Sequence, residues 1–273
     1  MTLAVSSTIL SADEAATTFE YETTRNIQYG EAAGSKLLLD AYVPKGDGPF
    51  PAVLVVHGGA WFSGSKSQLS FYAKALAKRG YACFSINYRL APKHKSPAQI
   101  DDCRTALKWV RTEGKAKHKV DASKVGAMGY SAGGQLVALL GTTGKKAEKA
   151  GDVDTRLQVV CAGGAPCDFR STPRNVRSLA FWLGGTRAEK PDAYTNASPL
   201  NFVTKDDSPM YFFNGGRDTL VKPKTAQAMH AALKKLNIDT KIHVVEKGTH
   251  LTTVIDRDAL KNAFEFLDKH LGN

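Results

Sequence analysis

The sequence contains no run of apolar residues that approaches the ~20 needed for a membrane-spanning helix. Its four cysteines form no Cys-x-x-Cys pair and no Cys/His cluster with zinc-ligand spacing, which argues against a structural metal. Cys161 and Cys167 lie close in sequence, but their spacing alone does not predict a disulfide. No internal repeat or low-complexity tract is evident, which excludes repeat architectures. The core is therefore expected to form without metal or disulfide support.

The charge pattern does not point to nucleic acid. The chain of 273 residues carries 37 Lys and Arg against 26 Asp and Glu, a formal net charge of +11. These cations are scattered, without a basic stripe interleaved with aromatics and without a nucleic-acid motif. A solvated basic surface is the expectation. A weaker alternative is that this surface docks the protein on an anionic polymer such as a decorated polysaccharide.

The N-terminal segment gives a limited indication of location. Residues 1–20 are small and polar, and we expect them to be flexible. Met1 to Ala16 lack a basic region and have only a short apolar stretch, so they are not a complete signal peptide. We expect a soluble protein, either cytoplasmic or exported with its signal peptide removed. The oligomeric state has no signal in the sequence.

From residue 21 onward, strand-like and helical segments alternate. The predicted strands are Thr24–Tyr29, Lys36–Val43, Ala52–His57, Tyr81–Tyr88, Lys124–Tyr130, Leu157–Gly163, Pro209–Asn214 and Lys241–Glu246. The predicted helices are Leu69–Arg79, Pro97–Thr112, a segment beyond Ser131, Pro223–Leu236 and Asp256–Leu271. This alternation predicts an α/β fold with a mostly parallel, doubly wound sheet, preceded by an antiparallel strand pair.

Residues 167–205 interrupt this alternation. They contain three prolines and an apolar patch from Leu179 to Leu183. We interpret them as a small lid-like insertion over the carboxyl edge of the sheet, within a single domain spanning residues 21–273. Chemistry gathers at that edge in parallel α/β sheets.

The segment Gly129-Tyr130-Ser131-Ala132-Gly133 matches the Gly-x-Ser-x-Gly pattern. It follows a predicted strand and precedes a predicted helix, the context in which this pattern places a nucleophilic serine on a sharp turn. Small residues on both sides let the hydroxyl project clear of the backbone. Ser131 is therefore the predicted nucleophile.

A serine hydroxyl needs a positioned base, and His250 is the histidine that fits. In this fold the chain order is Ser, acid, His, which places three of the seven histidines too early. His230 and His243 lie within predicted elements, and His270 lies near the end of the last helix. His250 follows the last predicted strand, in what we expect to be a loop.

Asp218 is the predicted acid that orients the base. It follows the strand Pro209–Asn214 by a short glycine-containing loop. Asp168, which follows the preceding strand, is the alternative acid.

A second glycine-rich turn, His57-Gly58-Gly59-Ala60-Trp61, follows the third predicted strand. Backbone N–H groups fixed in such a turn can stabilise the oxyanion of acyl transfer. We assign this role to Gly59 and Ala60, together with Ala132 after the nucleophile. His57 is expected to order the loop rather than to react. Trp61, Phe62 and Tyr130 are predicted to contact substrate, with packing of the loop as the alternative for Trp61. Core packing is at least as strong an alternative for Phe62 and for the further pocket candidates Phe181, Trp182 and Leu220.

Together, three sequence features resemble the hormone-sensitive-lipase-like esterases and the small feruloyl-esterase-like (BD-FAE) group of the α/β-hydrolase superfamily. These are the His57–Trp61 turn, Tyr88-Arg89-Leu90-Ala91-Pro92 with Asp101-Asp102 beyond, and Gly129–Gly134. The resemblance spans roughly residues 35–270. It implies that Ser131, Asp218 and His250 form the triad, that no cofactor or metal is used, and that Arg89 and Asp102 are structural.

These features predict a serine carboxylesterase acting on short-acyl or aryl esters, with a small ester or an acylated carbohydrate as substrate. The N-terminal segment is short for the helical cap of the lipase-like branch, which favours short acyl groups. One alternative is an amidase, formamidase or exopeptidase. Another is a catalytically silent hydrolase fold that serves as a binding module.

Overall fold

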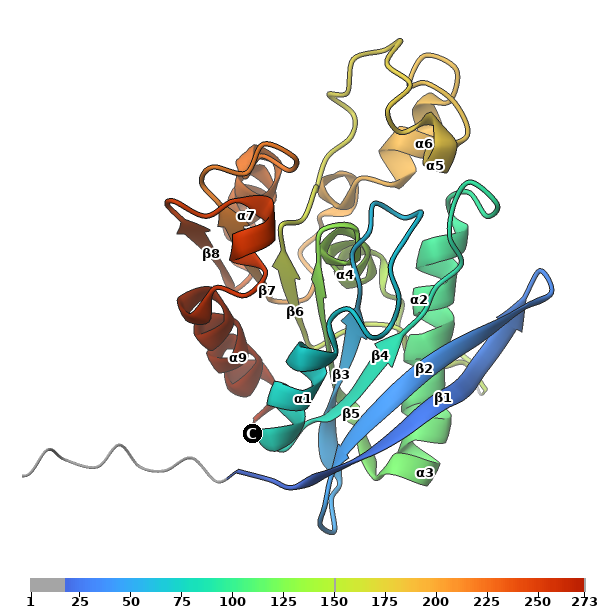
Figure 1. The fold of residues 1–273 in the computed structure, drawn as a ribbon, viewed down its shortest axis with the longest axis vertical. Helices are drawn as coiled ribbons and strands as arrows, with labels where there is room; N and C mark the ends of the chain where they lie inside the picture. Colours follow the sequence, from blue (N-terminus) through green and yellow to red (C-terminus); the bar gives the residue numbers. More distant parts are fainter. Residues whose placement is uncertain (1–17, 150, 273) are drawn as a thin grey trace, which may run out of the picture.

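The computed structural model describes residues 18–149 and 151–272, so most of the predicted flexible segment 1–20 lies outside the described residues. Within the described residues, one sheet has the strand order β1-β2-β4-β3-β5-β6-β7-β8 (Figure 1). The strands are β1 (Tyr21–Ala32), β2 (Ser35–Pro44), β3 (Phe50–Val56), β4 (Ala82–Ile86), β5 (Val120–Tyr130), β6 (Val159–Gly163), β7 (Met210–Gly215) and β8 (Thr240–Val245).

The direction of the strands confirms the predicted fold class. From β4 through β3 to β8, every neighbouring pair is parallel, whereas β2 runs antiparallel to both β1 and β4. All eight predicted strands are present, with shifted ends. The largest shift is in β5, which begins at Val120 instead of Lys124 because Phe50 of β3 pairs with Val120.

The central and edge strands differ in burial as their residues predict. Every residue of β3 is buried, as expected for a continuous apolar strand with helices on both faces. The edge strand β1 is mostly exposed, and its register with β2 shifts between Thr24 and Ile27 and again between Gln28 and Gly30. At the first of these shifts, between Thr24 and Ile27, Asn26 adopts a positive φ of 57° and donates its backbone N–H to Asp40 of β2.

Helices cover both faces of the sheet. They are α1 (Ser70–Lys78), α2 (Ala98–Trp109), α3 (Lys115–His118), α4 (Ala132–Thr143), α5 (Ala180–Leu183), α6 (Pro191–Asn196), α7 (Lys224–Lys235), α8 (His250–Thr253) and α9 (Arg257–Leu271). The apolar residues of α1 and α9 form one core cluster, and those of α2, α4 and α7 belong to the cluster on the other face. A doubly wound arrangement results.

The predicted helix Pro97–Thr112 ends later than expected. After α2 the chain makes a π-helical turn over Val110–Gly114 and continues as α3 to His118. Lys119, which follows α3, has a left-handed backbone with φ 55°, and this conformation ends the helix.

The segment between β6 and β7 contains α5, α6 and a 3-10 turn at Pro199–Phe202. Figure 1 shows α5 and α6, which belong to the segment 167–205 that the sequence analysis interprets as an insertion, beyond the carboxyl ends of the strands. Cys161 in the middle of β6 and Cys167 in this segment are free thiols, as are Cys83 and Cys103, and all four are buried.

Candidate active site

Ser131 occupies a strained turn between β5 and α4. Its φ of 57° and ψ of −121° are unusual for a residue with a side chain. A Cβ atom at Gly133 would lie 2.0 Å from the carbonyl oxygen of Val56, and one at Gly129 would lie 2.5 Å from the carbonyl oxygen of Gly133. This close packing explains why both positions of the Gly-x-Ser-x-Gly pattern must be glycine.

His250 connects Ser131 to Asp218 by two hydrogen bonds. Its Nε2 lies 2.9 Å from Ser131 Oγ, and its Nδ1 lies 2.6 Å from Asp218 Oδ2. A carboxylate can only accept, so Nδ1 carries the proton and Nε2 is free to accept one from the serine hydroxyl. The predicted nucleophile, base and acid are thus brought together in the order that proton abstraction requires.

Asp218 is held rigidly. Its side chain is fully buried, and its Oδ1 accepts hydrogen bonds from the backbone N–H groups of Leu220 at 2.9 Å and Val221 at 2.8 Å. With Oδ2 directed at His250, both carboxylate oxygens have partners. The imidazole orientation is therefore fixed by a side chain that cannot rotate without losing three hydrogen bonds.

His250 begins the short helix α8 instead of lying in the predicted loop. Thr249 caps this helix, since its side chain accepts from Thr252 N while Thr252 Oγ1 accepts from Thr249 N. The usual sequence signature of this cap has Glu or Gln at the third helical position, where this chain has Thr252, so the sequence pattern does not predict the cap. In addition, the Tyr130 hydroxyl donates to the carbonyl oxygen of His250 at 2.6 Å.

The Gly58–Trp61 turn lies beside the nucleophile. A Cβ atom at Gly58 would lie 3.2 Å from Ser131 Cβ, and one at Gly59 would lie 2.2 Å from the carbonyl oxygen of Ser63. Gly59 and Ala60 have positive φ values of 106° and 49°. Within the described part of the chain, the backbone N–H groups of Gly59, Ala60 and Ala132 donate to no protein acceptor. These three groups, predicted to bind an oxyanion, therefore remain available to a ligand.

His57 orders this turn, as predicted. It is buried, its ring stacks on Tyr88 at a centroid distance of 4.2 Å, and its Nδ1 lies 2.6 Å from the carbonyl oxygen of Gly58. Burial lowers the pKa of His57 from 6.5 to about 4, although the bond to Gly58 opposes this shift. At neutral pH the His57 ring is therefore uncharged.

With this geometry in place, a comparison of the sequence identifies its relatives. The model of the BD-FAE family matches residues 39–233. The chain belongs to the BD-FAE family. This match confirms the resemblance inferred from the three motifs.

Among curated proteins, Esterase LipC of Mycobacterium tuberculosis is 32% identical over 231 residues, covering 80% of this chain and 56% of LipC. The probable carboxylic ester hydrolase LipM of the same organism is 27% identical over 230 residues, covering 80% of this chain and 53% of LipM. The chain spans about half the length of these curated relatives.

Among solved structures, a truncated carbohydrate esterase from gut microbiota has a TM-score of 0.81 at 24% identity, covering 95% of this chain and 99% of that one. The bifunctional GH43-CE protein of Bacteroides eggerthii has a TM-score of 0.80 at 27% identity, covering 92% of this chain and 35% of that one. Together with the sheet order, these likenesses confirm the α/β-hydrolase fold.

Within this BD-FAE chain, Asp168 is not the partner of His250. Its carboxylate accepts from Arg170 at 2.8 Å from Nε and 3.0 Å from the backbone N–H. The alternative acid is thus engaged in a local ion pair. Arg89 and Asp102 form another pair, in which Arg89 Nη2 lies 2.7 Å from Asp102 Oδ1 and the Asp102 side chain is almost fully buried. This pair ties the loop after β4 to α2.

The three residues predicted to contact substrate have different environments. Trp61 and Tyr130 are buried, and the polar atom of each bonds to the protein. Phe62 is 53% exposed, and its ring meets that of Phe181 edge-on at 5.5 Å. The structure thus gives Trp61 and Tyr130 packing contacts, whereas Phe62 is open to a ligand. Of the further pocket candidates, Trp182 is packed in the core and Leu220 is exposed.

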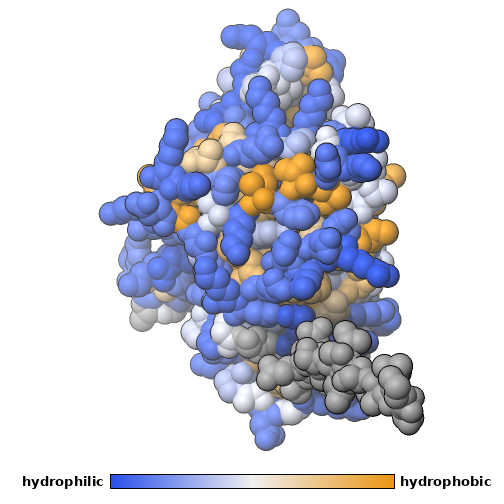
Figure 2. All heavy atoms as spheres, turned by 90° about the vertical axis from the view of Figure 1, so that its left-hand side faces the viewer, coloured by the Kyte–Doolittle hydropathy of each residue, from blue (hydrophilic) through white to orange (hydrophobic). Residues whose placement is uncertain are grey.

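Exposed apolar side chains flank the acid and the base. Leu220 follows Asp218 by two residues and Leu251 directly follows His250, and they are 75% and 76% exposed. Ile255, just beyond α8, is also exposed. Figure 2, which views the molecule from the left side of Figure 1, shows apolar groups among the polar surface on that face. Exposed apolar side chains next to the acid and the base in the chain favour contact with an apolar group of a ligand.

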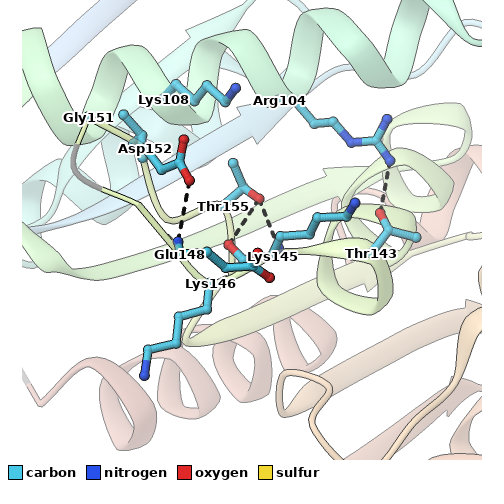
Figure 3. Close-up of a pocket in the computed structure, with 10 residues that line it drawn as sticks. Arg104, Lys108, Thr143, Lys145, Lys146, Glu148, Gly151, Asp152 and Thr155 are labelled. Carbon is cyan, nitrogen blue, oxygen red and sulfur yellow. Dashed lines mark hydrogen bonds between the residues drawn. The ribbon is translucent and has the colours of Figure 1, made fainter.

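A cavity of about 720 Å³ lies away from this site, at the far end of α4. Figure 3 shows Arg104 and Lys108 of α2 facing Thr143, Lys145 and the loop that carries Asp152. This cavity contains no nucleophile–base pair among its described lining residues. Within the described residues, no group of His, Cys, Asp and Glu is placed to hold a metal, and no helix has the length and apolar character to cross a bilayer.

Proposed function

We propose that this protein is a serine carboxylesterase that cleaves short-acyl or aryl carboxylic esters through an acyl-enzyme. The observation that carries this proposal is the hydrogen-bonded chain from Ser131 Oγ through His250 to Asp218 Oδ2. A buried, doubly anchored carboxylate behind an imidazole is the arrangement that lets a serine hydroxyl act as a nucleophile near neutral pH.

In the first half of the proposed reaction, Ser131 Oγ attacks the ester carbonyl carbon and His250 Nε2 takes the hydroxyl proton. The carbonyl oxygen becomes negatively charged, and the N–H groups of Gly59, Ala60 and Ala132 donate hydrogen bonds to it. The tetrahedral intermediate collapses as the carbon–oxygen bond of the ester breaks. His250 gives its proton to the departing alkoxide, which leaves as an alcohol.

In the second half, water replaces the alcohol. His250 removes a proton from the water, and the resulting hydroxide attacks the acyl carbon bound to Ser131 Oγ. The same three N–H groups stabilise the second oxyanion. Collapse of this intermediate releases the carboxylic acid and returns the proton from His250 to Ser131. Asp218 remains a carboxylate throughout and stabilises the imidazolium that forms twice in each cycle.

For the substrate, we propose a short-acyl ester on a carbohydrate. Two structural neighbours are named a carbohydrate esterase and an acetyl ester-xyloside bifunctional hydrolase, and a third, esterase 2 of Thermogutta terrifontis, is named as propionate-bound and butyrate-bound. Phe62 and Leu220 are exposed apolar contacts for an acyl or aryl group. We propose that the insertion carrying α5 and α6 forms one wall of this site.

The same three residues would also support hydrolysis of an amide, with an amine as the leaving group. The ratio of amide to ester turnover separates these two activities. A binding module with a silent site would instead fail to react with a fluorophosphonate, which phosphonylates an activated serine.

The test is hydrolysis of p-nitrophenyl esters from acetyl to palmitoyl by the wild-type protein and by Ser131→Ala. We expect the highest kcat/KM with acetyl or butyryl and a loss of several orders of magnitude in the variant. Activity of Ser131→Ala near that of the wild type would refute the assignment. A fluorophosphonate label on the wild-type protein, absent from the variant, gives an independent readout of the same residue.

A further inference from the structure

Two consecutive residues of the proposed oxyanion turn have left-handed backbones despite carrying side chains. Ala60 has φ 49° and Trp61 has φ 64°. Non-glycine residues rarely adopt this conformation, and they keep it only when the surrounding contacts hold them there. The contacts that hold Trp61 therefore determine where the neighbouring N–H groups of Gly59 and Ala60 point.

Those contacts come from outside the turn. The Trp61 ring stacks on Trp182 at a centroid distance of 3.7 Å and an interplanar angle of 3°, and both rings are buried. Phe169 meets the Trp61 ring edge-on at 5.8 Å. Trp182 and Phe169 both belong to the segment between β6 and β7. The insertion thus packs directly against the side chain that anchors the turn.

A single amide fixes this arrangement relative to the nucleophile. Gln135 lies one helical turn after Ser131 in α4, and its backbone N–H donates to the Ser131 carbonyl oxygen at 3.0 Å. Its Oε1 accepts from Trp61 Nε1 at 2.9 Å, and its Nε2 donates to the carbonyl oxygen of Ala197 in the insertion at 2.7 Å. Gln135 is completely buried.

The chemistry of the three partners makes glutamine specific at this position. An indole N–H can only donate and a carbonyl oxygen can only accept, so the amide has one possible orientation. Glutamate keeps the acceptor for Trp61, but it loses the donor for Ala197 and buries a charge. Methionine matches the length of glutamine but leaves both partners without a hydrogen bond in a buried site.

We propose that Gln135 is a positioning residue that, through Trp61 and the Trp182 stack, holds the Gly59 and Ala60 N–H groups at the oxyanion of the reaction. The insertion is accordingly part of the catalytic framework and not a freely opening lid. This inference rests on the proposed function, because the oxyanion arises only if Ser131 attacks an ester. Gln135 itself touches neither the substrate nor the reacting atoms.

The test measures hydrolysis of p-nitrophenyl acetate by the wild-type protein, by Gln135→Met and by Trp61→Phe. The Trp61→Phe variant keeps an aromatic ring but removes the N–H donor. A shift of about an ångström in the position of the oxyanion donors lowers the rate by about 10²-fold. We therefore expect kcat of both variants to fall by up to about 10²-fold with little change in KM. The inhibition constant of a trifluoromethyl ketone, whose adduct with Ser131 carries an oxyanion, should rise in parallel with the loss in kcat.

The matched control is Gln158→Met. Gln158 also bonds two groups, accepting from Val125 N at 2.9 Å and from Arg111 Nη2 at 3.3 Å, but it precedes β6 at the opposite end of the sheet from Ser131. We expect this variant to lower Tm while keeping kcat. If Gln135→Met and Trp61→Phe lower Tm but keep the kcat and the ketone affinity of the control, the positioning role is wrong.

If Gln135→Met fails to fold, Trp61→Phe decides the question by the same two readouts. The wild-type protein is measured first: if it neither hydrolyses esters nor reacts with a fluorophosphonate, the proposed function itself fails. Wild-type activity with unaffected variants overturns the positioning role alone.

Discussion

The hydroxyl of Tyr130 donates a 2.6 Å hydrogen bond to the backbone carbonyl oxygen of His250. The residue before the proposed nucleophile thereby holds the backbone of the proposed base. The two rings lie 5.2 Å apart, so Tyr130 also packs against the imidazole. The proposed nucleophile and the proposed base, which lie 119 residues apart in the chain, are thus connected through a side chain that need not touch the substrate.

Replacing Tyr130 with Phe should remove this hydrogen bond while keeping the aromatic ring that packs against His250. We expect kcat for p-nitrophenyl acetate to fall several-fold with KM unchanged, and the free energy of unfolding to fall by about 1 kcal/mol for the lost hydrogen bond. Steady-state kinetics and urea unfolding measure the two effects. A raised KM with an unchanged kcat would instead support the earlier prediction that Tyr130 contacts substrate.

Replacing Asp218 with Asn should remove the acceptor that fixes the His250 tautomer. In Ser-His-Asp proteases the equivalent change lowers kcat by about 10⁴-fold, and we expect a loss of this order here. Asp168→Asn is the control, because Asp168 pairs with Arg170 and not with His250. Equal losses in the two variants would show that Asp218 has no special role.

The buried His57 should make the protein less stable in acid. Its pKa is about 4 in the folded protein against 6.5 in the unfolded chain, so between these pH values the unfolded chain binds more protons. The free energy of unfolding therefore decreases as pH falls from 6.5 toward 4, by roughly 3 kcal/mol for the full shift at about 1.36 kcal/mol per pH unit. Urea unfolding at about pH 7 and about pH 5 measures this slope.

His57→Phe isolates the effect, because the ring that stacks on Tyr88 remains while the titrating group is lost. Burial raises the pKa of Asp207 to about 6, and this shift has the opposite sign: it favours the folded state as pH falls. Asp207 is unchanged in the variant, so its contribution is the same in both proteins. The effect of His57 is the difference between the two proteins in the slope of unfolding free energy against pH. Identical slopes for the two proteins would contradict the assignment to His57.

The pair formed by Lys66 and Asp40 should matter for stability. Lys66 Nζ lies 2.6 Å from Asp40 Oδ1, and the two side chains are 13% and 1% exposed. Lys66→Met leaves a buried carboxylate without its cation, which typically costs about 3–5 kcal/mol. Lys45→Met, which removes an exposed pair with Glu20, is the control and should leave the urea midpoint unchanged. Equal midpoints for both variants would contradict this view.

The sequence singled out the three side chains that the structure joins by hydrogen bonds, because each has a strong local signal. Ser131 is framed by glycines that the packing requires. Asp218 follows the buried strand β7 and His250 follows the edge strand β8, and the carboxyl ends of these parallel strands meet at one edge of the sheet. The central residues of the strands were predicted for a similar reason, because a short continuous apolar run such as β3 is typical of a strand buried on both faces. Strand and helix ends were predicted less well, because they depend on pairing partners and on a left-handed residue such as Lys119.

The directions of side chains near the site could not be predicted from the sequence. Tyr130 and Trp61 adjoin the proposed catalytic positions, which suggested substrate contact, yet both rings turn into the core. Successive strand residues face opposite sides of the sheet, so adjacency to Ser131 does not direct the Tyr130 ring to the same place. Gln135 had no signal at all, because its importance comes from Trp61 and Ala197, which lie far from it in sequence.

The irregular edge strand β1 has a consequence for how this protein behaves in concentrated solution. A long, straight edge strand offers unpaired N–H and C=O groups to any similar chain, and this is a common route to aggregation. Here two register shifts bend the strand, and the Asn26 N–H turns inward to Asp40 instead of facing solvent. The outer ladder is therefore broken, and a second molecule cannot extend the sheet in regular register along this edge.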